Sequence, residues 1–144
     1  MKEIMRYAGC FACGHKNPHG LQARFFWDGS TAFTELLAAE HFEGYKGIFH
    51  GGIVSTLLDE VMVKAILATG HYALTAEITI RYLLPVRTGQ KFRCEGRIVS
   101  HKGRLFHTTG LAIGEDGTIF AKAEARFLEV KPDFEKELKG SLSE

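Results

Sequence analysis

The feature that most constrains this chain is an apolar run that begins directly after two adjacent glycines. Gly51 and Gly52 open the run, which continues to Ala68 before Gly70 ends it. Its apolar residues recur with the helical period of 3.6, so the run predicts one long helix with a buried face. The arc expected to face the core holds Val54, Leu57, Leu58, Val61, Ala65 and Ala68.

An acidic residue, Asp59, lies on a second apolar arc of the same helix. Its neighbours on the wheel are Ser55, Met62, Val63 and Ile66. A carboxylate in such surroundings costs free energy unless it is hydrogen-bonded or has a chemical task. Asp59 is therefore either an acid at a polar interface between subunits or a catalytic carboxylate lining a pocket. Glu60 and Lys64 lie near the opposite rim with the spacing of an ion pair, so we expect both to be solvated.

The rest of the chain has the period-two alternation of strands. The predicted strands cover residues 21–27, 31–37, 74–84, 90–100, 105–113 and 118–130, and the strand at 74–84 has an unbroken alternation that ends at Pro85. A long connection, 38–49, precedes the helix. Because one helix must cover the apolar face of all these strands, we expect an α+β fold in which a curled antiparallel sheet wraps around it. The second apolar arc of the helix predicts a homodimer.

Length and composition predict one ordinary globular domain over residues 1–144. A CxxC segment, residues 1–19, precedes the first strand, and a charged tail, residues 131–144, holds one or two helical turns. The net charge of +1 gives no reason to expect nucleic acid or a charged membrane surface as a partner. The N-terminus lacks the apolar segment of a signal peptide, and the long helix carries charges, so we expect a cytoplasmic protein outside the membrane.

The three cysteines of the chain favour reduced thiols, because their number is odd and nothing indicates secretion. Cys10 and Cys13 form a CxxC, and His15 and His19 follow it, which together supply four nominal zinc ligands. This spacing matches no zinc finger, so we favour a small turn with packed thiols and expect no bound metal. Whether these four residues bind a metal stays open. Cys94 lies in a strand pattern and is expected in the core.

Three groups of residues together resemble one known family. They are His50-Gly51-Gly52 with Asp59 nine positions after the histidine, Cys10-Phe11-Ala12-Cys13-Gly14 with Asn17-Pro18 and Gly20-Leu21, and Thr75-Ala76 with Pro85-Val86. Over residues 10–130 the chain resembles the PaaI-like acyl-CoA thioesterases of the hotdog fold. The resemblance implies hydrolysis of an acyl-CoA thioester, no cofactor besides the CoA of the substrate, and a homodimer that can pair into a homotetramer.

The resemblance also implies roles for individual residues. The backbone amides of Gly51 and Gly52, at the start of the helix, would polarise the thioester carbonyl. Asp59 would act as general base or as nucleophile, and the sequence does not separate these roles. His50 would be mainly structural at the helix start. Thr75 matches a hydroxyl residue that, in the family, comes from the other subunit and positions the water.

Substrate contacts are expected from two further groups. Met62, Val63 and Ile66 could line the acyl site, and the cations Lys102, Arg104 and Arg81 could bind the phosphates of CoA. Two alternatives stay open, namely a non-catalytic acyl-CoA binding protein and a hotdog hydratase or dehydratase. His41-Phe42 would serve the latter, although its spacing to Asp59 argues against it. The sequence does not indicate which acyl chain is preferred.

Overall fold

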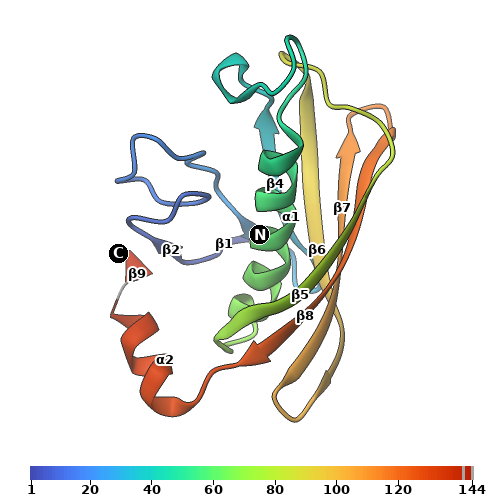
Figure 1. The fold of residues 1–144 in the computed structure, drawn as a ribbon. Coiled ribbons are helices and arrows are strands. Elements are labelled where there is room, and N and C mark those ends of the chain that lie inside the picture. Colours follow the sequence, from blue (N-terminus) through green and yellow to red (C-terminus); the bar gives the residue numbers. More distant parts are fainter. Residues whose placement is uncertain (141, 144) are drawn as a thin grey trace.

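The computed structural model describes residues 1–140 and 142–143, and its central element is the helix α1 (Gly51–Ala68). A seven-stranded antiparallel sheet curls around one side of this helix (Figure 1). The strands follow the order β1-β3-β4-β6-β7-β8-β5 across the sheet. Their bounds are β1 (Lys2–Glu3), β3 (Phe26–Trp27), β4 (Ala32–Leu37), β5 (Ala73–Tyr82), β6 (Lys91–Lys102), β7 (Leu105–Gly114) and β8 (Ile119–Glu129). The expected sheet wrapped around one long helix is confirmed, and it is the hotdog arrangement.

Smaller elements complete the chain. They are β2 (Arg6–Tyr7), which pairs with β9 (Leu142–Ser143), the short 3-10 helix η1 (Glu40–Phe42) and the tail helix α2 (Pro132–Lys139). The strand predicted over residues 21–27 is wrong except for β3. The amides of Leu21 and Ala23 instead donate to the carbonyls of Phe11 and Ala12, at 2.8 and 2.9 Å. These bonds tie the segment to the CxxC loop and not to a neighbouring strand.

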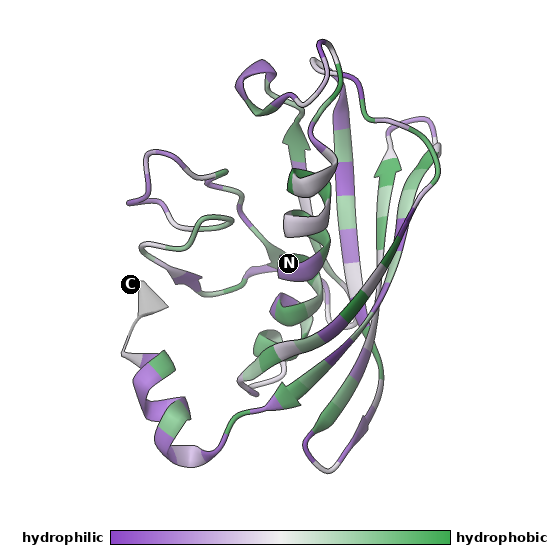
Figure 2. Ribbon diagram, viewed as in Figure 1, coloured by the Kyte–Doolittle hydropathy of each residue, from purple (hydrophilic) through white to green (hydrophobic). Residues whose placement is uncertain are grey.

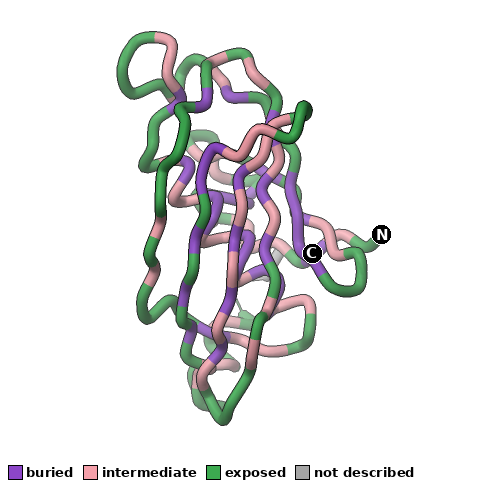
Figure 3. The backbone as a smooth tube through the Cα atoms, turned by 90° about the vertical axis from the view of Figure 1, so that its right-hand side faces the viewer, coloured by how far each residue is buried: buried purple, intermediate pink, exposed green. Residues whose placement is uncertain are grey.

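The hydrophobic core fills the space between α1 and the sheet. Hydrophobic and hydrophilic residues alternate along much of the sheet (Figure 2), and buried and more exposed residues alternate along most of β6, β7 and β8 (Figure 3). The helix contributes the predicted residues Val54, Leu57, Leu58, Val61 and Ala65, all buried, together with Met62 and Ile66. Cys94 is buried on β6 as expected. The helix lies so close to the sheet that a Cβ atom on Gly96 would be 2.7 Å from the carbonyl oxygen of Val61.

The N-terminal segment covers the side of α1 that faces away from the sheet (Figure 1). For this reason the prediction that Glu60 and Lys64 are solvated is wrong. The Lys64 side chain is only 1% exposed, its ammonium donates to the Met5 carbonyl, and it lies 3.8 Å from a Glu60 carboxylate oxygen. The ring of Tyr7 contacts the same ammonium from the N-terminal segment. The two residues do pair, but inside the protein.

Strand β5 lies at the edge of the sheet, and its alternation is interrupted. The register to β8 shifts between Thr75 and Glu77, so the prediction of an unbroken alternation is wrong. A bulge inserts one extra residue, which reverses the alternation of side-chain directions after it relative to that before it. In a regular strand, residues an odd number of positions apart point to opposite faces. Because of the bulge, Thr75 faces α1 while Ile78 and Ile80, an odd number of positions later, pack against the same core. No helix in the described part of the chain is long and apolar enough to cross a membrane.

Candidate functional site

The first turn of α1 contains a backbone amide, that of Gly51, for which no acceptor lies among the residues that the structure describes. His50 is the N-cap, and its Nδ1 accepts a hydrogen bond of 2.8 Å from the Gly52 amide. The carbonyl of His50 accepts from the amides of Ile53 and Val54. A free donor at a helix N-terminus, with the helix dipole behind it, favours an anion or a developing negative charge.

Tyr82 borders the same end of the helix, and sequence reasoning did not identify it as a site residue. Its hydroxyl donates to the Gly51 carbonyl at 3.0 Å, and its ring is 3.6 Å from where a Cβ of Gly51 would lie. Gly51, Val54 and Tyr82 line a cavity of about 290 Å³. One sequence signal could have indicated that Tyr82 borders the site. It is an aromatic residue with a polar hydroxyl, and it comes at the end of an apolar alternation.

Asp59 is held by a hydroxyl of its own chain. The Thr75 Oγ1 donates to the Asp59 Oδ1 at 2.7 Å. Burial raises the pKa of Asp59 above its ordinary value, and the hydrogen bond from Thr75 acts in the opposite direction. Thr75 also lines a second cavity, of about 260 Å³, on the same seam between α1 and β5. A carboxylate with a raised pKa and a fixed orientation is suited to accept a proton from water.

The Gly51 amide and Asp59 are far apart within one chain. Asp59 lies eight positions after Gly51 on α1, and at a rise of 1.5 Å per residue this corresponds to about 12 Å. One thioester carbonyl therefore cannot contact both groups of the same chain. The resemblance placed the hydroxyl on the other subunit, whereas here Thr75 and Asp59 of one chain are bonded to each other.

The remaining residues named from the sequence lie in several places. Val63 lines the second cavity, while Met62 and Ile66 are completely buried between the helix and the sheet. Arg81 is exposed beside Tyr82, near the start of α1. Lys102 and Arg104 are exposed in the turn between β6 and β7, next to His101.

That turn lies at the far end of the helix from Gly51. His101 packs its ring against His71, which follows the end of α1, with ring centroids 5.1 Å apart. His41, named for the hydratase alternative, is exposed on η1 and contacts the ring of Phe42. These positions separate the three cations into two groups, Arg81 near the helix start and the other two near its end.

A second polar cluster lies where the N-terminal segment meets α1. The Sγ of Cys10 donates to Glu60 at 3.7 Å, and the backbone amide of Cys13 donates to the Sγ of Cys10 at 3.3 Å. Burial raises the pKa of Glu60 to about 7, and a hydrogen bond from the Cys13 thiol lowers the pKa of Cys10 to about 7. His15 and His19, the other nominal metal ligands, are exposed and lie outside this cluster.

Comparison with protein families and curated proteins gives one consistent answer. The family model described as the thioesterase superfamily matches residues 46–121. The acyl-coenzyme A thioesterase THEM4 of Mus musculus is 26% identical over 94 residues, which are 65% of this chain and 40% of that protein. The Bos taurus THEM4 is 22% identical over 135 residues, covering 92% of this chain and 56% of that protein. The chain thus spans about half the length of these relatives.

Solved structures share the fold at low identity. A thioesterase superfamily protein matches with a TM-score of 0.79 and 23% identity, over 84% of this chain and 60% of that one. The Escherichia coli PaaI protein from the phenylacetic acid degradation operon matches with a TM-score of 0.72 and 15% identity, over 77% and 81%. A Streptococcus mutans UA159 protein, solved bound to acetyl-CoA, matches with a TM-score of 0.70 and 21% identity, over 74% and 88%.

Proposed function

Since the family model matches more than half of its residues, the chain belongs to the thioesterase superfamily, and we propose that it hydrolyses acyl-CoA thioesters to a free acid and CoA. The observation that carries this proposal is the bonded pair of Asp59 and Thr75 on the seam between α1 and β5. The similarity to THEM4 and to a protein solved with acetyl-CoA supports acyl-CoA as the substrate class.

The two chemical tasks fall to different parts of the helix. The Gly51 amide donates to the carbonyl oxygen of the thioester, where negative charge grows as water attacks. Asp59, oriented by Thr75, takes a proton from that water, which then bonds to the carbonyl carbon. The carbon–sulfur bond then breaks, and the leaving CoA sulfur takes the proton that Asp59 had accepted, so that CoA departs as a thiol and Asp59 is again a carboxylate. Direct attack by the Asp59 carboxylate is the competing route, through an anhydride that water would open.

A complete site requires two copies of the chain. Because about 12 Å separate Gly51 from Asp59 along one helix, the two groups must come from different copies to reach one carbonyl. Among the described residues no strand pairs with the outer edge of β5, and this edge offers the contact, since an edge strand can pair with the same strand of a second copy. The exposed apolar residues of β5 and the segment after it support this interface: Leu74, Tyr82, Leu83 and Leu84.

An antiparallel pairing of β5 with its copy reverses the direction of the second chain. The end of β5 that carries Tyr82 and Arg81 then lies beside the start of the copy's β5. In each chain that start is close to the turn with Lys102 and Arg104, because Leu74 and Leu105 both pair with Leu128. The dimer therefore gathers cations from both copies near one Gly51, where the CoA phosphates need them. Light scattering tests the dimer: we expect at least twice the chain mass of 16.0 kDa, and a monomer contradicts it.

The activity is tested by a hydrolysis screen. Purified protein is offered acyl-CoAs that differ in chain length and aromaticity, and release of the CoA thiol is followed with a thiol reagent. We expect turnover of at least one acyl-CoA, and its loss in Asp59→Asn. Tight binding of acyl-CoAs without turnover of any of them would favour the non-catalytic alternative. Hydration of an unsaturated acyl-CoA without thiol release would favour the hydratase alternative.

A further inference from the structure

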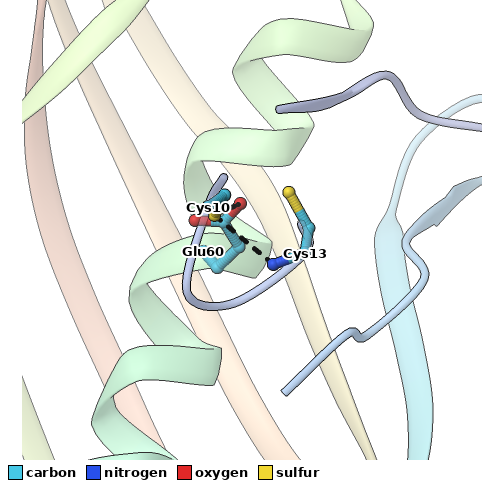
Figure 4. Close-up of side chains that lie close together, drawn as sticks. All are labelled: Cys10, Cys13 and Glu60. Atoms are coloured by element: carbon cyan, nitrogen blue, oxygen red, sulfur yellow. Dashed lines mark hydrogen bonds between the residues drawn. The ribbon is translucent and has the colours of Figure 1, made fainter. Parts of the chain in front are cut away.

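The cluster between the N-terminal segment and α1 has the composition of a transition-metal site. We propose that the Sγ atoms of Cys10 and Cys13 and the carboxylate of Glu60 bind one thiophilic divalent cation of the Zn²⁺ class. These three ligand atoms lie within 4.8 Å of one another (Figure 4). The site replaces the set of Cys10, Cys13, His15 and His19 considered from the sequence, and it differs from the expectation of no metal. It is independent of the thioesterase proposal.

The distance between the Cys10 sulfur and the Glu60 carboxylate fits a tetrahedral ion. With Zn–S bonds of about 2.3 Å and Zn–O bonds of about 2.1 Å, tetrahedral angles place a sulfur and an oxygen about 3.6 Å apart. The Sγ of Cys10 and the Oε2 of Glu60 are 3.7 Å apart. A metal can therefore replace the shared proton without a large movement of either side chain. Two soft thiolates favour Zn²⁺ over Mg²⁺ or Ca²⁺.

The CxxC loop has its ligand geometry fixed by the backbone. The amide of Cys13 donates to the Sγ of Cys10, a bond that would stabilise this sulfur as a thiolate. The loop closes through the Gly14 amide, which donates to the Cys10 carbonyl at 2.8 Å. A Cβ on Gly14 would lie 2.4 Å from the Ala8 carbonyl oxygen, so only glycine fits. The CxxC loop is therefore already ordered without a metal, and metal binding would require little further ordering of it.

The buried Lys64 balances the charge of such a site. Two thiolates and one carboxylate carry three negative charges, so a divalent cation leaves one negative charge in a buried place. The ammonium of Lys64 lies 3.8 Å from the Glu60 carboxylate and supplies the compensating charge. Cys10 and Glu60 also line the cavity that reaches Thr75, so a water from that cavity can fill the fourth position.

The site is tested by metal binding, with no dependence on hydrolysis. Chelator-treated protein, kept reduced with a phosphine, is titrated with Co²⁺, whose thiolate complexes absorb in the near ultraviolet. We expect one Co²⁺ per chain, a sulfur-to-cobalt charge-transfer band with tetrahedral ligand-field bands, and displacement by Zn²⁺. Absence of the thiolate band in correctly folded protein would overturn the proposal.

Variants assign the ligands. Cys13→Ser, which leaves the Cys10 thiolate in place, should lose at least about half of the charge-transfer intensity, and Glu60→Gln should bind Co²⁺ at least about tenfold more weakly. Cys94→Ala is the matched control, since Cys94 is buried elsewhere and should change neither. Should Cys13→Ser not fold, Glu60→Gln decides alone. Unchanged affinity in Glu60→Gln, or a tenfold loss in His15→Ala or His19→Ala, would contradict the ligand set.

Discussion

The packing of the central helix against the sheet can be tested by replacing a glycine of β6 that contacts the helix. Gly96 on β6 is buried, and an alanine there would place its Cβ 2.7 Å from the Val61 carbonyl oxygen and 2.8 Å from the Val61 carbonyl carbon. Both atoms belong to the helix backbone, so neither can turn aside. Non-bonded carbon atoms prefer about 3.5 to 4.0 Å. The whole of α1 would have to retreat by several tenths of an ångström.

The cost of Gly96→Ala follows from this retreat. Overpacking of a well-filled core costs about 1–3 kcal/mol, and the lower chain entropy of unfolded alanine returns about 0.4–1 kcal/mol. Because the clash is with helix backbone, the overpacking cost lies at the upper end of its range, about 3 kcal/mol, and we expect a net loss of about 2 kcal/mol in the free energy of unfolding. With a urea dependence of about 2 kcal/mol per molar, the unfolding midpoint falls by roughly 1 M. Circular dichroism at fixed protein concentration measures it, because a dimer's stability depends on concentration.

The cross-strand neighbour of Gly96 provides the control. Gly110 on β7 pairs directly with Gly96 and also faces α1. A Cβ on Gly110 would meet the side-chain end of Met62 at 3.3 Å, and methionine adapts easily. Gly110→Ala should change stability by less than about 0.5 kcal/mol. Equal effects of the two substitutions, or a Gly96→Ala protein as stable as the wild type, would refute this description of the packing.

Three further predictions concern the site and its supports. Gly51→Pro removes the free amide at a helix position that accepts proline, so kcat should fall by about 10²–10³ while Gly51→Ala, which keeps the amide, stays within about threefold. Because the Thr75 bond lowers the pKa of Asp59, Thr75→Val should move the acidic limb of the kcat/KM profile to higher pH; a limb that stays in place or moves down contradicts this. Lys64→Met should lower the free energy of unfolding by about 1.5–3 kcal/mol, since it removes a charged hydrogen bond to the Met5 carbonyl together with the ion pair to Glu60, against at most about 0.5 for the exposed Lys122→Met; equal losses would disprove the buried pair.

The overall fold follows from the sequence because its periodic signals are strong. The helix appears as an apolar run bounded by glycines, and five of the six predicted strands extend within a few residues of β4, β5, β6, β7 and β8. The burial of Glu60 and Lys64 does not follow, because a helical wheel contains no information about a segment fifty residues earlier in the chain. Their i, i+4 spacing is the same on a solvated face and under a covering loop.

The sequence suggests residue types for the candidate site but does not show how they are arranged. The position of Thr75 depends on a bulge, which adds one residue to a strand and leaves no mark in the alternation of side chains. Likewise, the contact of Tyr82 with Gly51 depends on the position of β5 along the axis of α1, which the sequence does not indicate. Cys10 and Glu60 meet only because the N-terminal segment folds back over α1.

Mixed dimers test the central claim, that one copy supplies Asp59 and the other supplies the Gly51 amide. Chains carrying Asp59→Asn and chains carrying Gly51→Pro are co-expressed with different tags, and the mixed dimer is isolated through both. Each variant alone should be nearly inactive, whereas the mixed dimer retains one intact site of two and should show about half of the wild-type kcat. A mixed dimer as inactive as its parents would contradict the shared site.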